Sequence, residues 1–564
     1  MTTSNDSLPP GGLAAVDALL QPFNRSDAPG LVVGIARAGK TIYRRGVGLA
    51  SIEQGVAMSP RTRVRIASTS KQFTCLGVLL LAEDGLLDLD DPVYQHLPEL
   101  PVLHPAGPTL RQLMQHLGGW RTDLAAVAQG LALQPQADWS QPLSDPNREL
   151  NFEPGTRMIY SNTGYQLLAR VIERLSGRRF EDFMRERIFA PLQMHDTESL
   201  SSDLEIRPGL AMQYQAQPAA AGGGLRRGIY PGELRGSGSL VSTVDDMLRW
   251  LAHLRSPRKT VGSAASWAQM IELPRLSTGT RLPYALGLMR HPYRGVEVIH
   301  HAGAVLGATS QMITVPGHEL DIMIMVNGAP VSPVALAFQI IDALLGDSLG
   351  EPAPHVPTEG HAAVLGRHYR AAATGAVLGF EDAGGKLALN WLGSRGLPLR
   401  LNKGDGGDEG LLPCEETALN PLSVALGQLA GEAAPDVITI SDGGHLLRCE
   451  RLPEQPPSSA ALAPTLVGRY RVPDLQTSAR IDIEDEGGTV HLVVRLQGTH
   501  GRSAYRLQPL SSEVLLAMPA DALFAGIGGA GVINIEREAD RVTGLRLDAS
   551  RLRRLHFIRE EQSA

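Results

Sequence analysis

The sequence has 564 residues, a length at which three or four folding units are expected. Hydrophobic residues make up 43% and charged residues 20%, which is typical of a soluble globular protein with well-formed cores. The net charge is −7 and no run of five or six like charges occurs, so nothing predicts a nucleic-acid surface or a polybasic membrane patch. We therefore expect chemistry on small molecules or proteins, without a nucleic-acid or membrane partner.

Cysteine use and the start of the chain suggest a cellular compartment. Cys75, Cys414 and Cys449 are an odd number at wide spacing, too few for a disulfide framework or a zinc cage. Their expected role is that of small buried side chains. The first 28 residues show no signal-peptide pattern, and the longest apolar stretch, 76–82, is far shorter than the ~18 residues of a membrane span. These features predict a cytoplasmic protein.

The first part of the chain mixes strand and helix patterns. Segments 31–37 and 41–43, joined by a polar turn, predict a β-hairpin. Segments 165–175 and 245–254 carry apolar residues at helical spacing, with Asp245 as a candidate N-cap of the second. Because strands and helices do not alternate as βαβ units, the predicted fold class is α+β.

Two polar stretches that contain several prolines, 346–360 and 452–464, have the composition of linkers. They divide the chain into units at 1–345, 346–457 and 458–564.

The two tail units repeat each other at a period just over a hundred residues. Residues 365–369 match 467–470, and residues 380–387 match 483–490. The second unit also alternates around a Gly-Gly turn, which is a hairpin pattern. We therefore predict two small all-β antiparallel barrels, since barrels close their own edges.

Ser68 and Lys71 form the central motif of the first unit, at the start of an apolar stretch that predicts a helix. Positions i and i+3 lie on one helix face, which brings the hydroxyl and the amine within hydrogen-bond reach. Burial along an apolar helix disfavours the charged form of lysine, so the amine is able to act as a base near neutral pH. The pair thus supplies a nucleophile and its base.

The Ser-x-x-Lys spacing is a weak signal by itself. It also occurs at Ser256 and Lys259, among prolines and basic residues and without a following apolar helix. For the first match, the alternative is a helix cap at Ser68 and an exposed charge at Lys71.

Two further motifs carry polar groups. Tyr160 and Asn162 lie two residues apart, so in an extended or turn segment the phenol and the carboxamide face the same side. His301, Gly303 and Ala304 belong to a His-Ala-Gly-Ala stretch, whose small residues leave room for a substrate backbone along a strand edge. Taken singly, a loop hydrogen bond and a surface histidine explain them.

Together and in this order, the three motifs resemble those of the serine β-lactamase and penicillin-binding family. The resemblance covers roughly residues 15–345 and includes segments such as 109–116, 188–197 and 238–243. The third motif is often Lys-Thr-Gly in the family, whereas the sequence here is His-Ala-Gly. This departure is similar to the esterase and D-aminopeptidase branch.

The resemblance implies a role for each matched residue. Ser68 is the acylated nucleophile and Lys71 its base. Tyr160 passes the proton to the leaving amine, and Asn162 holds the acyl side-chain region. His301 stands where a lysine often stands and donates a hydrogen bond or a positive charge near Tyr160.

The resemblance further implies that the amides of Ser68 and Ala304 form the oxyanion hole. No metal or organic cofactor is expected. A catalytic domain followed by two eight-stranded barrels resembles the bacterial D-aminopeptidases, which release an N-terminal D-residue from short peptides, amides and esters. A homodimer is a plausible assembly by the same resemblance.

In such enzymes a loop of the last barrel is expected to enter the catalytic cleft. The best candidate loop is 517–531, in which Asp521 offers a carboxylate to the substrate ammonium; a solvated turn residue is the alternative. Residues 526–531 fit a dinucleotide fingerprint, but they precede a strand-like segment, so they predict a flexible loop.

Three hypotheses follow. The first is an aminopeptidase for a small N-terminal D-residue such as D-Ala, acting on a small peptide or amide. The second is an esterase, β-lactamase or DD-peptidase of the same superfamily, for which the barrels are only a scaffold. The third is a catalytically silent protein that binds peptides or β-lactams, against which the four residues Ser68, Lys71, Tyr160 and His301 argue.

Overall fold

The computed structural model describes most of the chain. The residues it describes are 9, 11–122, 149–217, 222–230, 234–392, 394–401, 412–414, 422–426, 433–475, 477–497, 502–520, 530–549 and 551–561. No helix among these residues combines the length and the apolar character that a membrane crossing needs.

A six-stranded antiparallel sheet, in the order β10-β11-β12-β13-β1-β2, is the centre of the N-terminal unit, by which we mean the elements from α1 to α10. The predicted hairpin is confirmed and has a register shift after Ile35. The strands of this sheet are β1 (Leu31–Arg37), β2 (Lys40–Val47), β10 (Met289–Tyr293), β11 (Val296–Val305), β12 (Ala308–Val315) and β13 (Leu320–Val326).

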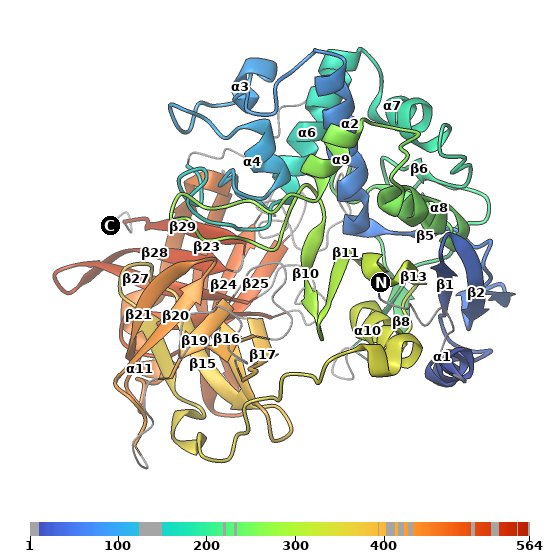
Figure 1. Cartoon of the computed structure of the whole chain (residues 1–564). Helices are drawn as coiled ribbons and strands as arrows, with labels where there is room; N and C mark the ends of the chain where they lie inside the picture. The colour runs from blue at the N-terminus through green and yellow to red at the C-terminus, as the bar shows by residue number, and fades with distance from the viewer. Residues whose placement is uncertain are drawn as a thin grey trace.

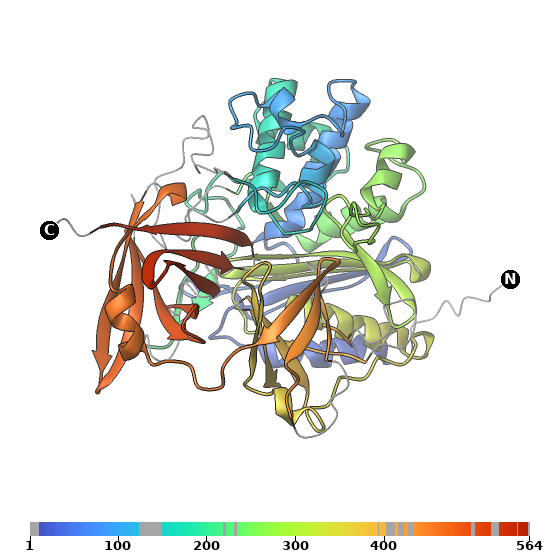
Figure 2. The same ribbon diagram turned by 90° about the vertical axis from the view of Figure 1, so that its left-hand side faces the viewer.

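Helices cover both faces of the sheet (Figures 1 and 2). α1 (Gly12–Leu20) and α10 (Pro333–Leu345) lie on one face, and α8 (Val244–Arg255) lies on the other. The side chains of a strand alternate between its two faces, so neighbouring residues of β1 belong to different hydrophobic cores. Val32 lies in the core between the sheet and α8, and Val33 lies in the core between the sheet and α10.

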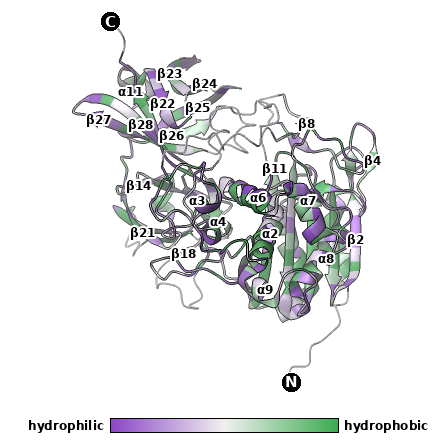
Figure 3. Ribbon diagram, turned by 90° about the horizontal axis from the view of Figure 1, so that it is seen from above, coloured by the Kyte–Doolittle hydropathy of each residue, from purple (hydrophilic) through white to green (hydrophobic). Residues whose placement is uncertain are grey.

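The helix that follows Ser68 is α2 (Lys71–Glu83), and it is buried along most of its length. It packs against α6 (Asn162–Ser176) and α9 (Ala264–Met270), which lie beside it in Figure 3. A Cβ on Gly77 would lie 3.0 Å from Ile172 Cδ1, so glycine allows the close approach of α2 and α6. This packing fixes the helix that carries the Ser-x-x-Lys motif.

The start of α8 corrects one prediction. Its N-cap is Thr243, whose hydroxyl accepts from the amide of Asp246, whereas Asp245 lies in the first turn and pairs with Arg44 at 2.7 Å. Thr243 has the extended backbone that a cap requires, so its hydroxyl satisfies the free helix amide.

The remaining elements of the N-terminal unit are short. They are η1 (Gln21–Phe23), β3 (Leu49–Ser51), β4 (Val56–Ala57), β5 (Val64–Arg65), η2 (Ala67–Ser70), α3 (Val93–His96), α4 (Leu110–Met114), α7 (Phe180–Met184), the π-helix η3 (Arg185–Phe189), β6 (Glu198–Ser199), β7 (Tyr214–Ala216), β8 (Leu225–Arg227), β9 (Leu240–Ser242) and η5 (Pro316–His318). η6 (Gly346–Ser348) and η7 (Ala362–Val364) follow α10.

The tail contains the two predicted all-β units. In the first, β14 to β21 form an eight-stranded sheet whose two edge strands are β17 and β18. Leu399 and Cys414, the residues that follow these two strands, form a single β-bridge with each other. Its strands are β14 (His368–Ala371), β15 (Val377–Asp382), β16 (Leu387–Trp391), β17 (Ser394–Pro398), β18 (Leu412–Pro413), β19 (Leu422–Ala425), β20 (Val437–Asp442) and β21 (His445–Arg451).

The second all-β unit is a closed eight-stranded barrel, which we call the last barrel, preceded by α11 (Ser459–Leu466). Its elements are β22 (Gly468–Val472), η8 (Pro473–Leu475), β23 (Thr477–Glu486), β24 (Thr489–Gln497), β25 (Arg502–Pro509), β26 (Val514–Pro519), β27 (Gly531–Glu538), β28 (Arg541–Ala549) and β29 (Leu552–Arg559). The sequence prediction of an α+β unit followed by two all-β units is thus confirmed.

The three cysteines have the structural role that the sequence predicted. Cys75, Cys414 and Cys449 are all buried and unpaired with one another. Burial raises the pKa of each thiol to about 12, so they remain protonated and behave as small apolar side chains.

Candidate active site

Ser68 lies in η2, a single turn that leads directly into α2. Ala67, the residue before it, has a φ of 49°, in the left-handed region that costs a non-glycine residue about 1 kcal/mol. The Ser70 hydroxyl donates to the Ala67 carbonyl at 2.6 Å and so holds this conformation. The result is a half-buried Ser68 side chain at the head of α2.

Lys71 is fully buried, which excludes the alternative of an exposed charge. Its Nζ lies within hydrogen-bond distance of three acceptors: Ser68 Oγ at 3.3 Å, Asn162 Oδ1 at 2.9 Å and the Ser237 carbonyl at 2.6 Å. The i, i+3 spacing therefore brings the hydroxyl and the amine together as the sequence predicted. Asn162 and Ser237 come from distant segments and aim the amine at Ser68.

Tyr160 lies in non-helical backbone just before α6, whereas Asn162 is already helical, so the predicted extended or turn segment ends before Asn162. Ser161 is the N-cap, its hydroxyl accepting from the Gly164 amide, and Asn162 is the first helical residue. Both side chains nevertheless reach Lys71: the Tyr160 ring centre lies 4.8 Å from Nζ, and Asn162 accepts from it. In this structure Asn162 positions the amine, a role that the sequence did not assign to it.

Sequence reasoning missed two aromatic residues around Tyr160. The ring centre of His116 lies 4.0 Å from that of Tyr160, and the ring centre of Tyr284 lies 6.3 Å away. His116 Nδ1 accepts from the Ser161 amide at 3.1 Å, and burial lowers the pKa of His116 well below its usual range. The signal for His116 was present, because it ends the segment 109–116 that supported the family resemblance.

His301 is buried in β11, and its hydrogen bonds define its protonation. A carbonyl oxygen only accepts, so Nδ1 carries the proton and donates to the Ala302 carbonyl at 2.5 Å. Nε2 therefore accepts from the Tyr284 hydroxyl at 2.9 Å. Burial, with the positive charge of Lys71, lowers the pKa of His301 to about 3. The sequence predicted that His301 donates a hydrogen bond or a positive charge near Tyr160. In the structure the imidazole is neutral, and its one N–H donates to the Ala302 carbonyl.

Because His301 is neutral in the folded protein, we expect the free energy of unfolding to fall at acid pH. In the unfolded chain a histidine has a pKa of about 6.5. Because the folded value is lower, His301 contributes its full stability above about pH 6.5 and loses it as the pH falls towards 3, a change on the order of 4 kcal/mol when complete. Urea unfolding between pH 7 and pH 4 measures this slope. The His301→Gln variant is expected to have a shallower slope, and an unchanged slope would contradict the assignment.

Gly303 allows β11 to lie against the turn that carries Ser68. A Cβ at this position would be 2.1 Å from the Ile66 carbonyl oxygen and 2.6 Å from Ser310 Oγ. Ser310 in turn donates to the Ile66 carbonyl at 2.7 Å. The glycine therefore locks the sheet to the serine turn, with no room for a methyl group.

Ala304 lies one residue further along β11 and is exposed. It pairs with Thr309 of β12, while β10 pairs with β11 from Val296 to His300. The segment of β11 that follows His301 thus extends beyond its pairing with β10, beside the serine turn.

The predicted loop residue Asp521 lies outside the described residues. A turn of the last barrel between β28 and β29 approaches the catalytic residues. There, Arg551 Cζ lies 4.7 Å from the Tyr160 ring centre. No sequence pattern indicates this contact, which joins residues almost four hundred positions apart.

The last barrel is attached to the N-terminal unit beside this turn. The Arg121 guanidinium is fully buried and pairs with Asp474 at 2.8 Å and with Glu149 at 3.0 Å. It also donates to the Arg554 carbonyl at 3.0 Å. These contacts place charged groups of the barrel and of the N-terminal unit in one buried cluster.

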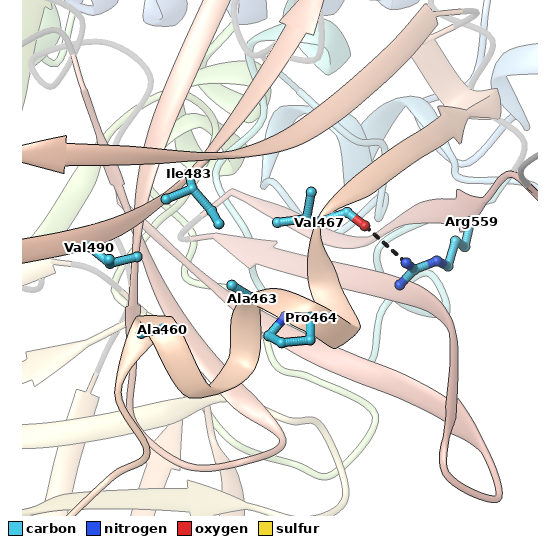
Figure 4. A pocket seen from close by; sticks show the side chains of 7 residues that line it. All are labelled: Ala460, Ala463, Pro464, Val467, Ile483, Val490 and Arg559. Atoms are coloured by element: carbon cyan, nitrogen blue, oxygen red, sulfur yellow. Dashed lines mark hydrogen bonds between the residues drawn. The ribbon is translucent and has the colours of Figure 1, made fainter.

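A surface groove elsewhere on the last barrel has a different character. It has a volume of about 600 Å³ and lies between α11 and the β23–β24 hairpin, with apolar side chains and Arg559 along its walls (Figure 4). Arg559 donates to the Val467 carbonyl at 2.9 Å. None of the residues around Ser68 lines this groove, so it is separate from the site.

Comparison with known proteins places this geometry in context. The D-aminopeptidase of Cereibacter sphaeroides (strain KD131 / KCTC 12085) is 28% identical over 557 residues, covering 97% of this chain and 98% of the relative. The D-aminopeptidase of Gluconobacter oxydans (strain 621H) is 27% identical over 555 residues, with the same coverage. Both alignments include the two all-β units.

Solved structures share the fold. The octameric penicillin-binding protein homologue from Pyrococcus abyssi matches with a TM-score of 0.53 and 21% identity over 78% of this chain and 100% of that chain. D-amino acid amidase from Ochrobactrum anthropi SV3 matches with a TM-score of 0.50 and 24% identity over 59% of this chain and 98% of that chain. The family model described as Beta-lactamase matches residues 16–345, which hold the whole serine, lysine, tyrosine and histidine arrangement. The chain therefore belongs to the Beta-lactamase family and is a serine hydrolase.

Proposed function

We propose that this protein is a D-aminopeptidase that removes a small N-terminal D-residue through an acyl-enzyme on Ser68. The contact of 3.3 Å between Lys71 Nζ and Ser68 Oγ carries the proposal, because it pairs a nucleophile with a base. Relatives named D-aminopeptidase align over 97% of the chain, including its all-β units, which favours this activity over a simple esterase or β-lactamase.

Acylation begins at Lys71. With its amine neutral, two N–H groups remain bonded to Asn162 Oδ1 and the Ser237 carbonyl, so the lone pair faces Ser68. The amine takes the hydroxyl proton while Oγ bonds to the substrate carbonyl carbon. Holding the base in this orientation before substrate arrives avoids the cost of ordering it during the reaction.

The tetrahedral intermediate then has to lose its amine. Its oxyanion accepts hydrogen bonds from the backbone amides of Ser68 and Ala304, each donor contributing about 10²- to 10³-fold in rate. Tyr160 gives its proton to the leaving nitrogen, the C–N bond breaks, and the phenolate regains a proton from the Lys71 ammonium. Lys71 Nζ lies 4.8 Å from the Tyr160 ring centre, so the two groups of this transfer are neighbours.

Deacylation reverses the proton path with water in place of the amine. Water gives a proton to the neutral Lys71, directly or through Tyr160 as Tyr160 passes its own proton to Lys71, while the water oxygen bonds to the acyl carbon. The Lys71 ammonium then returns that proton to Oγ as the bond between Oγ and the acyl carbon breaks. The neutral His301 holds the Tyr284 hydroxyl and takes no proton in this path.

Hydrolysis of D-alanine p-nitroanilide tests the proposal. The wild-type enzyme is expected to release p-nitroaniline from the D-isomer and not from the L-isomer. Ser68→Ala is expected to lower kcat/KM by on the order of 10⁴-fold or more, since no other group replaces the nucleophile. Intact-protein mass spectrometry with a fluorophosphonate probe should show an adduct that Ser68→Ala lacks.

The second Ser-x-x-Lys match supplies the control. Ser256 bonds the Arg258 backbone at the exposed end of α8, so Ser256→Ala should retain full activity. Equal hydrolysis of both isomers would remove the stereospecific part of the proposal. Hydrolysis of a β-lactam or a simple ester in place of the anilide would favour the alternative members of the superfamily.

A further inference from the structure

The turn between β28 and β29 brings a cation from the last barrel to the catalytic tyrosine. Arg551 Cζ lies 4.7 Å from the Tyr160 ring centre, and Lys71 Nζ lies 4.8 Å from the same centre. Both distances are measured from the same ring centre. Arg551 Cζ and Lys71 Nζ therefore lie no further apart than the sum of these two distances. Arg551 is half-buried, and its charge is among the causes that lower the pKa of the neighbouring His116.

One carboxamide of the N-terminal unit, that of Asn151, holds the backbone of the turn. Asn151 Nδ2 donates to the Arg551 carbonyl at 3.1 Å, and Asn151 Oδ1 accepts from the Arg553 amide at 2.8 Å. Arg554 then donates to the Leu150 carbonyl at 2.7 Å. These contacts join the N-terminal unit to the turn at Arg551 and at the residues that follow it, so the fold fixes the backbone that carries the guanidinium.

The base of the turn is also fixed within the barrel. The buried Asp548 accepts from the Arg554 amide at 3.0 Å and pairs with Arg546 at 3.3 Å. Arg554 itself has a φ of 55°, and the strand register shifts between Leu547 and Ala549. Such a bulge re-aims a hairpin, and here it directs the turn towards Tyr160.

The position of Arg551 identifies the part of a substrate that it faces. In the proposed reaction Tyr160 protonates the leaving amine, so a group stacked on Tyr160 lies on the leaving-group side of the scissile bond. His301 is neutral and has both nitrogens engaged, so it supplies no charge there. In a dipeptide, the carboxylate is attached through one carbon to the leaving nitrogen.

We infer that Arg551 is a specificity residue that binds a carboxylate on the leaving group, and that the enzyme therefore acts best on dipeptides with a free C-terminus. The inference rests on the proposed function and names its substrate class. A guanidinium matches a carboxylate with two parallel N–H···O bonds, and its planar shape holds both bonds in one geometry. After hydrolysis the second residue leaves as a free amino acid.

Two substrates that differ only in this group test the inference. D-Ala-Gly and D-Ala-glycinamide share the scissile bond, and only the first carries a carboxylate. The wild-type enzyme is expected to have the higher kcat/KM for D-Ala-Gly, and Arg551→Ala is expected to lower the ratio of the two values by about 10- to 100-fold. Arg551→Lys should give an intermediate ratio, because it keeps the charge but not the paired geometry.

Arg541→Ala is the matched control. Arg541 is an exposed arginine in the same barrel, at the far end of β28, where it pairs with Glu561. The ratio should be unchanged in this variant. A fall of both values by the same factor in Arg551→Ala would overturn the inference, since that result indicates a structural role. A wild-type enzyme without preference between the substrates would overturn it as well.

Binding separates this inference from the proposed function. The two peptides are used to protect Ser68 against a fluorophosphonate probe, which reports occupancy without turnover. If neither peptide is hydrolysed but D-Ala-Gly protects better than D-Ala-glycinamide in the wild type and not in Arg551→Ala, the inference holds and the proposed function fails. Equal protection by both peptides in the wild type would overturn the inference whatever the activity.

Discussion

Lys71→Met is expected to lower kcat/KM for D-alanine p-nitroanilide by about 10²- to 10⁴-fold, the usual contribution of a general base. The reason is geometric: Lys71 Nζ is the amine that lies 3.3 Å from Ser68 Oγ, and it is fully buried. The rate of Ser68 labelling by a fluorophosphonate should fall in parallel, because the loss concerns the nucleophile. Lys71→Arg should be equally inactive, since a guanidinium stays charged and accepts no proton.

The control is the lysine of the chance motif. Lys259 Nζ donates to the carbonyls of His253 and Leu254, each at 2.8 Å, at the end of α8. Its substitution removes these two bonds and leaves the site intact, so Lys259→Met should retain kcat/KM within about twofold. An active Lys71→Arg enzyme would show that charge alone is what Lys71 provides, and it would contradict the assignment of the base.

Arg121→Ala is expected to destabilise the protein by about 3–5 kcal/mol, as is usual when one partner of a buried ion pair is removed. Its guanidinium is fully buried against Asp474 of the last barrel, whose side chain is 8% exposed. Removing the arginine leaves that carboxylate buried without its main partner. Equilibrium denaturation in urea, followed by tryptophan fluorescence, measures the change.

A double-mutant cycle isolates the pair. The loss in Arg121→Ala/Asp474→Ala should be smaller than the sum of the two single losses, since the second substitution removes the stranded charge. Arg44→Ala provides the surface control: the Arg44 side chain is 55% exposed and that of Asp245 is 30% exposed, so this variant should lose less than about 1 kcal/mol. Additive losses for Arg121 and Asp474 would contradict the coupling.

Local spacing was sufficient to predict the serine and its base. Ser68 and Lys71 are three residues apart on one helix turn, so helical geometry alone brings them together. The all-β tail was predictable for a similar reason, because hairpins are local and the two units repeat. Tyr160 and His301 were predicted from the order of the three motifs along the chain. That order is known from the family resemblance and does not follow from the periodicity of the sequence.

The rest depends on contacts that no local pattern encodes. The Arg551 turn reaches Tyr160 only because Asn151 bonds its backbone across the domain boundary. The charge state of His301 depends on burial and on the Tyr284 hydroxyl, which neither motif contains. At the start of α8 the sequence predicted a cap at Asp245, but the extended backbone that a cap requires occurs two residues earlier, at Thr243.

The close packing at Gly303 has a mechanical consequence. Ser68 is anchored on two sides, because Gly303 of β11 packs against the turn before it and α2 after it packs against α6. Lys71 of α2 also bonds Asn162 of α6 at 2.9 Å. The serine turn is therefore clamped between strand and helical layer, and a bulkier side chain at either glycine, Gly77 or Gly303, would disturb the nucleophile without touching a catalytic group.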